Sequence, residues 1–204
     1  MNSVFIRPPK VAGASIENTL GIKQYNHLDH VTTNFHQEGL ASFGHMDYAL
    51  LVKDGYVTPD FDATAYKFAF VRNPYDRAVS WYFFANARGR VPSTMTFLGF
   101  VREFLSKPME PIGLYNGVRR SQYNPQIRWT ENVNLDYLGR YETLHTDIAV
   151  LAEVLGVDAP DPPIVHYSDH GPYATYYCDE SKEIVGKAHK EDFDQFSYSS
   201  TLLH

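Results

Sequence analysis

A lysine followed by small residues stands directly after the first apolar stretch of this chain. Residues 4–6 (Val-Phe-Ile) predict a short buried strand, and Pro8-Pro9 ends it because proline donates no ladder hydrogen bond. Lys10 follows, and four small residues come soon after it: Ala12, Gly13, Ala14 and Ser15. Small side chains let backbone amides approach a ligand, and a helix that begins there points its free N–H groups at the same place. Together with the charge of Lys10, this stretch predicts a site for phosphate or sulfate.

A packing turn is the alternative for the same stretch. Many turns between a strand and a helix contain Gly, Ala and Ser only because the backbone packs tightly there, and most lysines are solvated. The stretch does not fit the nucleotide-kinase loop, which needs two glycines four residues apart and then Lys-Ser or Lys-Thr. It also lacks the GxGxxG fingerprint of dinucleotide-binding folds. Both the anion site and the packing turn therefore stay open at this point.

A second apolar stretch ends on an arginine. Residues 66–71 predict a central, buried parallel strand, and Arg72 sits at its carboxyl end, where open α/β sheets bind ligands. Pro74 suits the first turn of a helix over residues 75–87, which carries Ser80. An arginine fork and a helix hydroxyl can grip one phosphate together.

Ion pairs are the alternative for the arginines of this second stretch. Arg72 and Asp76 lie four residues apart, so they can form a structural ion pair instead of binding a ligand. We interpret Arg77 as structural, as an ion-pairing residue on the helix.

Two motifs carry a resemblance to a known family. Residues 7–15, Arg-Pro-Pro-Lys-Val-Ala-Gly-Ala-Ser, resemble the 5′-phosphosulfate loop (typically PKTAGTS) of sulfotransferases that use 3′-phosphoadenosine 5′-phosphosulfate (PAPS). Residues 67–80 resemble the family's 3′-phosphate motif, an apolar strand followed by RNPxDRxxS. The likeness is to the family that contains heparan sulfate 2-O-sulfotransferase and related carbohydrate sulfotransferases. Residues 138–144 and 191–198 resemble later segments of that family, so the similarity runs from residue 4 to about residue 198.

The resemblance implies transfer of a sulfuryl group from PAPS to a hydroxyl, without a metal, and release of 3′-phosphoadenosine 5′-phosphate (PAP). Lys10 and Arg7 would stabilise charge as the bond to phosphate breaks. Lys10 and the loop residues Ala12, Gly13, Ala14 and Ser15 would hold the 5′ end, and Arg72 with Ser80 the 3′-phosphate. Val11 and Ala14 stand where the family usually has threonines. Each missing neutral hydrogen bond weakens cofactor binding by ~1 kcal/mol.

His45 is the candidate general base. Residues 43–46 (Phe-Gly-His-Met) stand between the two motifs, where the resemblance places a His-Gly-His-Val segment with the catalytic histidine. Phe43 replaces the first histidine of that pattern. A histidine near its ordinary pKa can remove a proton from an acceptor hydroxyl. The alternative is that His45 is an ordinary packing or surface histidine.

Composition limits the protein class. The chain has 204 residues, 44% of them apolar, which fits one globular domain over residues 1–204. Its net charge of −6 argues against nucleic acid as a partner, and favours a neutral glycan, small metabolite or tyrosine over a long sulfated polymer as the acceptor. Local basic pockets are still possible at Arg72/Arg77, Arg88/Arg90 and Arg119/Arg120. No apolar run approaches the ~20 residues of a membrane span and no signal core is visible, so we expect a soluble, cytoplasmic protein without a membrane anchor.

The remaining segments predict a three-layer α/β domain with a mainly parallel sheet and a P-loop-like phosphosulfate loop. We expect a first helix over 15–20, a helix with an aromatic core stripe over 95–105, a strand over 135–141 and helices over 143–155 and 179–188. We expect loops over 23–39, 55–64, 113–131 and 158–172. In the first of these loops, His27, His30 and His36 do not have a spacing backed by other metal ligands, so a surface loop is favoured over a metal site. In the third, arginines and aromatic residues slightly favour a part in the site: Arg119, Arg120, Tyr123, Arg128 and Trp129.

Three functions remain open. The first is an active PAPS sulfotransferase, with a carbohydrate as the favoured acceptor. The second is a nucleotide phosphotransferase, against which the missing Gly-Lys-Ser/Thr and the lack of an obvious magnesium carboxylate both count. The third is a binding module that holds PAP without catalysis.

Overall fold

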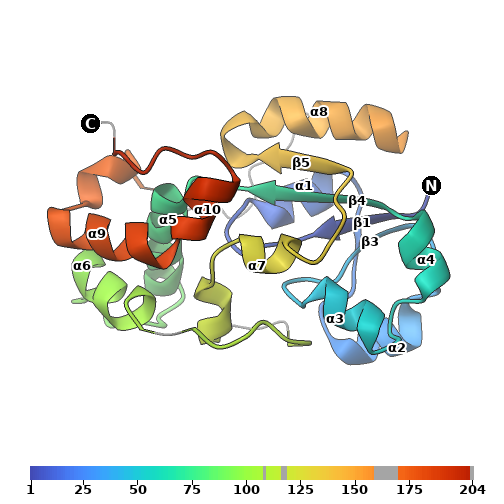
Figure 1. The fold of residues 1–204 in the computed structure, drawn as a ribbon, viewed down its shortest axis with the longest axis horizontal. Helices are drawn as coiled ribbons and strands as arrows, with labels where there is room; N and C mark the ends of the chain where they lie inside the picture. Colours follow the sequence, from blue (N-terminus) through green and yellow to red (C-terminus); the bar gives the residue numbers. More distant parts are fainter. Residues whose placement is uncertain (108, 116–118, 159–169, 203–204) are drawn as a thin grey trace.

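The computed structural model describes residues 1–107, 109–115, 119–158 and 170–202. Its centre is a sheet of five parallel strands in the order β2-β3-β1-β4-β5 (Figure 1). The strands are β1 (Ser3–Ile6), β2 (Lys23–Gln24), β3 (Leu40–Ser42), β4 (Tyr66–Val71) and β5 (Tyr137–Arg140). The predicted α/β class with a parallel sheet is therefore confirmed.

The register brings the carboxyl ends of the three central strands to one edge. Phe5 pairs with Ser42 across β1 and β3, and Ile6 pairs with Ala69 across β1 and β4. The chain segments that leave these strands, at residues 7–12, 43–47 and 72–73, therefore start side by side. These segments hold Arg7, Lys10, Ala12, His45 and Arg72 of the predicted site, whereas residues 13–15 and Ser80 lie on the helices that follow the first and third segments.

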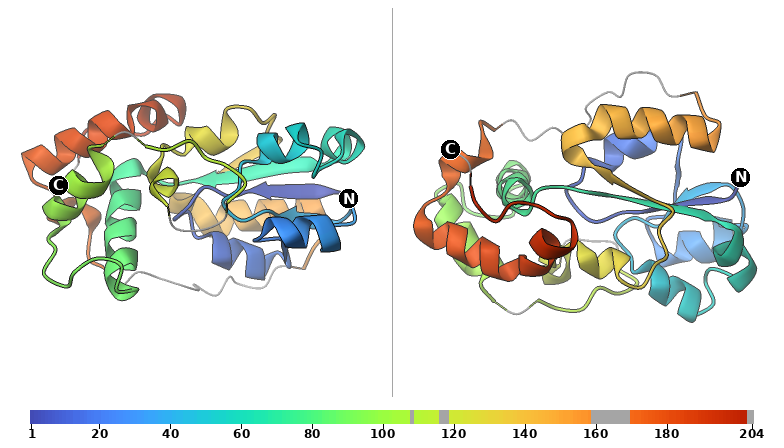
Figure 2. Two further views of the ribbon diagram at one scale, coloured as in Figure 1. Left: turned by 90° about the horizontal axis from the view of Figure 1, so that it is seen from below. Right: turned by 45° about the horizontal axis from the view of Figure 1, so that its top comes forward.

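Helices cover both faces of the sheet, as the left view of Figure 2 shows. On one face, α1 (Gly13–Thr19) and α8 (Leu144–Leu155) pack on the aromatic rings of β1 and β4. On the other, α3 (Tyr48–Lys53), α4 (Pro59–Thr64) and α7 (Ile127–Thr130) share a core with β1, β3 and α2 (Leu28–Asn34). The result is the predicted three-layer arrangement.

A third group of helices lies beyond the carboxyl ends of the strands, where the arrowhead of β4 points in Figure 1. It contains α5 (Pro74–Ala87), α6 (Phe97–Phe100), the π-helical turn η1 (Val101–Leu105), α9 (Asp179–Ala188) and α10 (Lys190–Gln195). Short 3-10 turns occur at η2 (Arg120–Tyr123), η3 (Tyr141–Thr143) and η4 (Tyr173–Tyr176). The predicted core role of the aromatic stripe is confirmed, because Phe97 and Phe100 are buried. The site edge of the sheet is thus enclosed between the sheet and a helical block.

Three predicted loops are wrong. Residues 23–39 contain β2 and α2, residues 55–64 contain α4, and residues 113–131 contain a 3-10 turn and α7. Each of these short α-helices is anchored by one buried apolar residue, Val31 in α2, Phe61 in α4 and Trp129 in α7. Helix α4 also begins at a side-chain cap, since the amide of Phe61 donates to Thr58 Oγ1 at 3.3 Å. One anchor per helix is too weak a pattern for hydrophobic periodicity to detect.

The helices differ in length and in the residues at which they begin and end. The longest helix of the described residues is α5, with 14 residues, and none is long and apolar enough to cross a membrane. Helix α8 stops at Gly156, which takes a left-handed φ of 67° that favours glycine. Thr143 precedes α8, but its hydroxyl donates to Asp147 instead of capping a helix amide. Most of the predicted loop at 158–172 lies outside the described residues.

Candidate functional site

The loop between β1 and α1 has an unusual backbone. Lys10 and Ala12 have φ values of 70° and 63°, a left-handed region that non-glycine residues rarely adopt. Such conformations cost about 1–3 kcal/mol each and concentrate at ligand sites. Conformations of this kind can turn successive amides toward one point and form a concave site for an anion. The amide of Ser15 bonds back to the Ala12 carbonyl at 2.9 Å, whereas those of residues 11–14 have no acceptor among the described residues.

Arg7 lies underneath this loop. Its Nη1 is 3.1 Å from Glu17 Oε2, and the Glu17 side chain on α1 is only 1% exposed. Burial raises the pKa of Glu17, and the charge of Arg7 opposes that rise. Gly13 passes directly over Arg7, since a Cβ at position 13 would come within 2.2 Å of Arg7 Nε. Glycine is therefore required at position 13 by a close approach.

Replacing Gly13 by alanine is expected to destabilise the protein by about 1–3 kcal/mol, the usual cost of overpacking. The added methyl group must displace the Arg7 side chain from Glu17, although alanine is otherwise the better helix former. Thermal melting would measure the loss. The matched control is Gly113→Ala, where a Cβ meets nothing within 4 Å, and which should leave the melting temperature nearly unchanged. Equal melting temperatures for both variants would contradict the prediction.

The Lys10 side chain points from the loop toward α5. Its Nζ lies 4.2 Å from the ring centroid of Phe84 and 5.9 Å from that of Trp81. Lys10 forms none of the ion pairs between described residues. An ammonium group held against rings without a carboxylate is poised for an anionic ligand.

Several arginines surround Lys10. Burial, and to a smaller extent neighbouring positive charges, lower the pKa of Lys10 to about 7. These charges, in decreasing order of effect, belong to Arg72, Arg88, Arg7 and Arg90. Of the basic pairs noted in the sequence, the structure thus brings Arg72 and the Arg88/Arg90 pair to Lys10. In a protein of net charge −6, this local collection of cations can attract an anionic ligand.

Arg72 is held on three sides. Its Nε donates to Asp76 Oδ2 at 2.7 Å, so the ion pair considered as an alternative does form. Its Nη1 donates to the Lys10 carbonyl at 3.4 Å, and its guanidinium lies 3.8 Å from the Tyr141 ring centroid. Nη2 donates none of the hydrogen bonds found between described residues. The ion pair and the stacking therefore orient the guanidinium and leave one edge for a ligand.

Both predicted serines are buried. Ser15 on α1 is 1% exposed and Ser80 on α5 is 2% exposed. They lie on the two helices that flank the Lys10 loop.

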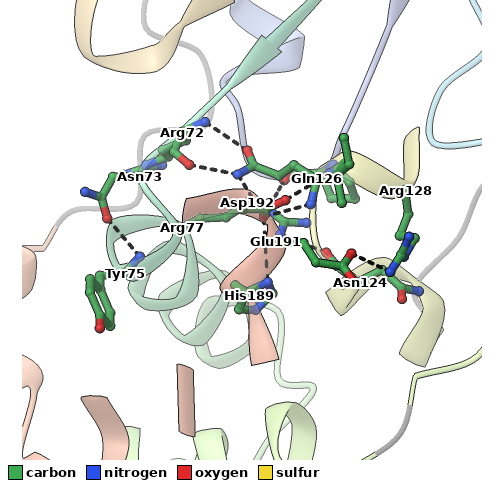
Figure 3. A network of polar contacts seen from close by, with 12 residues as sticks. Arg72, Asn73, Tyr75, Arg77, Asn124, Gln126, Arg128, His189, Glu191 and Asp192 are labelled. Carbon is green, nitrogen blue, oxygen red and sulfur yellow. Dashed lines mark hydrogen bonds and ion pairs between the residues drawn. The ribbon is translucent and has the colours of Figure 1, made fainter. Parts of the chain in front are cut away.

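Arg77 holds the loop from its other side. It is 1% exposed, and its Nε donates to the Pro9 carbonyl at 2.9 Å. Its Nη1 donates to the Asn124 carbonyl at 2.9 Å. Figure 3 shows it beside Asn124 and Asp192. The structural role expected for Arg77 is confirmed, but the expected ion pair on its own helix is wrong, because carbonyl oxygens take the guanidinium.

His45 is half-buried where β3 gives way to α3. Its Nδ1 lies 2.9 Å from the Arg7 carbonyl, which can only accept, so Nδ1 carries the ring proton. Nε2 is then the ring nitrogen that can take a proton. Burial and the charge of Arg7 lower the pKa of His45 to about 3, so the imidazole is neutral near pH 7. Trp129 supports this loop, since its Nε1 donates to the His45 carbonyl at 3.0 Å.

Of the other residues predicted in the segment 119–131, Tyr123 packs on Trp81, with ring centroids 4.9 Å apart, and two arginines make contacts elsewhere. The Arg119 guanidinium covers Tyr115 at 3.8 Å, and Arg128 pairs with Glu131 and Glu191 at the surface. Sequence reasoning missed Glu17 and Phe84 as neighbours of the site. For Glu17, the available signal was its place next to the apolar Ile16 on a short helix, which could indicate a buried carboxylate. Nothing in the sequence distinguished Phe84 from the other aromatic residues of α5.

Comparisons with known proteins identify a family and a shared fold. A family model described as "Sulfotransferase family" matches residues 3–199. The crystal structure of mouse sulfotransferase SULT7A1 complexed with PAP shares the fold, with a TM-score of 0.58, 15% identity, and coverage of 95% of this chain and 85% of that one. A sulfotransferase from Alicyclobacillus acidocaldarius has a TM-score of 0.54 and 17% identity, with coverage of 98% and 97%. No curated protein sequence matches the chain.

Proposed function

The chain belongs to the sulfotransferase family, and from this premise we propose that it transfers a sulfuryl group from PAPS to a hydroxyl acceptor, with residues 1–204 acting as one domain. The observation that carries the proposal is Lys10, an ammonium group without a carboxylate partner among the described residues and surrounded by arginines. PAPS carries a 3′-phosphate and a 5′-phosphosulfate, so it brings the negative charge that this cluster lacks.

The donor roles follow from the placement of each residue. Lys10 and the amides from Ala12 to Ser15 would hold the 5′-phosphosulfate. Arg72, with its open guanidinium edge, and Ser80 would hold the 3′-phosphate. Arg7 would act from below the loop, where its charge reaches both Lys10 and His45. Preorganised cations of this kind stabilise the charge that develops on the leaving phosphate.

The reaction needs one proton acceptor. His45 Nε2 would take the proton from the acceptor hydroxyl as its oxygen forms a bond to sulfur. The bond between sulfur and the phosphate oxygen breaks, and its electron pair leaves with PAP. Lys10 would balance the resulting charge. We propose a carbohydrate as the acceptor, because the motif likeness is to carbohydrate sulfotransferases.

A non-catalytic PAP-binding protein is the second candidate. It is favoured by Val11 and Ala14, which lack the hydroxyls usual in the loop. Backbone amides remain available at those positions, so donor binding is retained in either case.

Calorimetric titration with PAP, adenosine 5′-monophosphate (AMP) and ATP tests the cofactor. We expect PAP to bind about 10–100-fold more tightly than AMP, because the 3′-phosphate adds charged hydrogen bonds. Tighter binding of ATP than of PAP would instead favour a phosphotransferase. A panel of neutral oligosaccharides, uronate-containing oligosaccharides and tyrosine peptides, incubated with PAPS and analysed by mass spectrometry, then separates an enzyme from a binding module.

PAP binding is expected to weaken as pH rises above neutrality. An anionic ligand raises the pKa of Lys10 from about 7, so binding takes up a proton wherever the empty site is deprotonated. The affinity should fall by at most about tenfold per pH unit, the limit for one linked proton. Calorimetry in buffers of different ionisation enthalpy would measure the uptake. A pH-independent affinity between pH 7 and 9 would contradict this assignment.

A further inference from the structure

The main chain of Arg72 is held by one side chain. Gln126 Oε1 accepts from the Arg72 amide at 2.8 Å, and Gln126 Nε2 donates to the Arg72 carbonyl at 2.8 Å (Figure 3). The last sheet pair of β4 is Val71 with Arg140, so Arg72 lies just beyond the pairing. The Gln126 amide therefore takes the place of a neighbouring strand at this residue. We call this arrangement, Gln126 on Arg72, the amide clamp.

Asp192 sets the orientation of the clamp. Its Oδ2 accepts from both the amide and Nε2 of Gln126, at 2.8 and 3.2 Å. Its Oδ1 accepts from the amide of Ile127 at 2.9 Å. A carboxylate can only accept, so the NH₂ end of Gln126 must face Asp192. That choice leaves Nε2 for the Arg72 carbonyl and Oε1 for the Arg72 amide, as observed.

The clamp places a carboxylate in the protein interior, which costs free energy. Asp192 and Gln126 are both 0% exposed, and Asp192 comes from α10 near the end of the chain. Burying a carboxylate is costly unless its hydrogen bonds are satisfied. The buried Asp192 carboxylate is not needed merely to link α10 to α7, because the surface ion pair of Arg128 with Glu191 already links these two helices. The Asp192 carboxylate therefore has a role beyond linking these helices, and its hydrogen bonds to Gln126 indicate what that role is.

The geometry points to a positioning role. We propose that Gln126, oriented by Asp192, fixes Arg72 so that its open guanidinium edge meets the 3′-phosphate, and thereby sets the preference for a 3′-phosphorylated nucleotide. This inference rests on the proposed function. Asp76 and Tyr141 orient the guanidinium, but both act on the side chain. Among the described residues, the hydrogen bonds to the amide and carbonyl of Arg72 itself come from the clamp.

The ratio of AMP to PAP dissociation constants tests the clamp, because the two ligands differ only in the 3′-phosphate. Gln126→Met keeps the side-chain length and removes both hydrogen bonds to Arg72. We expect the ratio to fall by about tenfold, since small misplacements of a binding group have effects of this order or larger. AMP affinity should change much less. Asp192→Asn retains one acceptor oxygen and should lower the ratio less than Gln126→Met.

Glu191→Gln is the matched control, because it removes the surface link between the same helices and should leave the ratio unchanged. A folded Gln126→Met variant with the wild-type ratio would overturn the proposal. If that variant does not fold, the same criterion applies to Asp192→Asn, and loss of folding in both would assign the clamp to stability alone and likewise overturn it. A wild-type protein that binds AMP as tightly as PAP would instead refute the proposed cofactor site.

Discussion

Replacing Lys10 by methionine is expected to weaken PAP binding by about 10–100-fold, since a hydrogen bond to a charged group is worth about 1.5–3 kcal/mol. Methionine has a similar length and can keep the contacts with Phe84 and Trp81. What it removes is the ammonium group at the centre of the arginine cluster. Transfer should fall further than binding, because charge on the leaving phosphate develops only as the reaction proceeds.

The same substitution should not lower the stability of the empty protein. Lys10 is repelled by four arginines and partly buried, and both effects disfavour its charged form. We therefore expect an unchanged or higher melting temperature together with weaker PAP binding. Lys53→Met is the control, because Lys53 is exposed on α3 and forms no ion pair among the described residues. A variant that binds PAP like the wild type would show that Lys10 does not contact the donor.

The loop and the two strands beside it could be predicted because several local signals coincide there. An apolar run, two prolines, a lysine and small residues all indicate a strand that turns into a helix. Arg72 could be placed for the same reason, since an apolar strand ends immediately before it. Parallel strands with helical connections then bring both segments to one edge of the sheet. These inferences need only short-range patterns and one topological rule.

The partners of these residues could not be predicted. Arg7 meets Glu17 ten positions later, which a short helix makes possible only if α1 begins at Gly13 and packs against the strand. Gln126 and Asp192 lie 66 residues apart, and neither stands in a motif that marks it as a neighbour of Arg72. The helices α2 and α4 were missed because each depends on one buried anchor. Tertiary packing decides all of these contacts, and no periodicity in the sequence reports it.

Phe43 stands where the motif that this segment resembles has a histidine, and the structure shows what that difference does. The family pattern places two histidines in this segment, but Phe43 packs in the core with Phe35 and Tyr25. A ring at that position therefore stabilises the β3 end rather than contributing a titratable group. The single remaining histidine receives its orientation from the Arg7 carbonyl and from Trp129, which are backbone and core contacts. The candidate base is thus fixed by the fold and does not require the first histidine.

Replacing His45 by glutamine is expected to lower the rate of sulfuryl transfer by about 10²–10⁴-fold, the usual contribution of a general base. Glutamine retains a polar side chain near the Arg7 carbonyl but cannot accept the proton of a hydroxyl. PAP affinity should change by less than a few-fold, so the loss should lie in kcat. Single-turnover transfer to the acceptor identified for the wild-type protein would measure it. His36→Gln, at an exposed position, is the control.

An NMR titration of the imidazole tests the same assignment without an acceptor. With a pKa of about 3, His45 of the empty protein should not titrate between pH 5 and 8, whereas an exposed histidine titrates near 6.5. If PAP binds at Lys10 as proposed, it would place negative charge near the ring, which favours the protonated form and raises this pKa. The rise makes the imidazole a stronger base when the donor is present. A His45 resonance that titrates near 6.5 in the empty protein, or a glutamine variant with full transfer activity, would remove His45 from the mechanism.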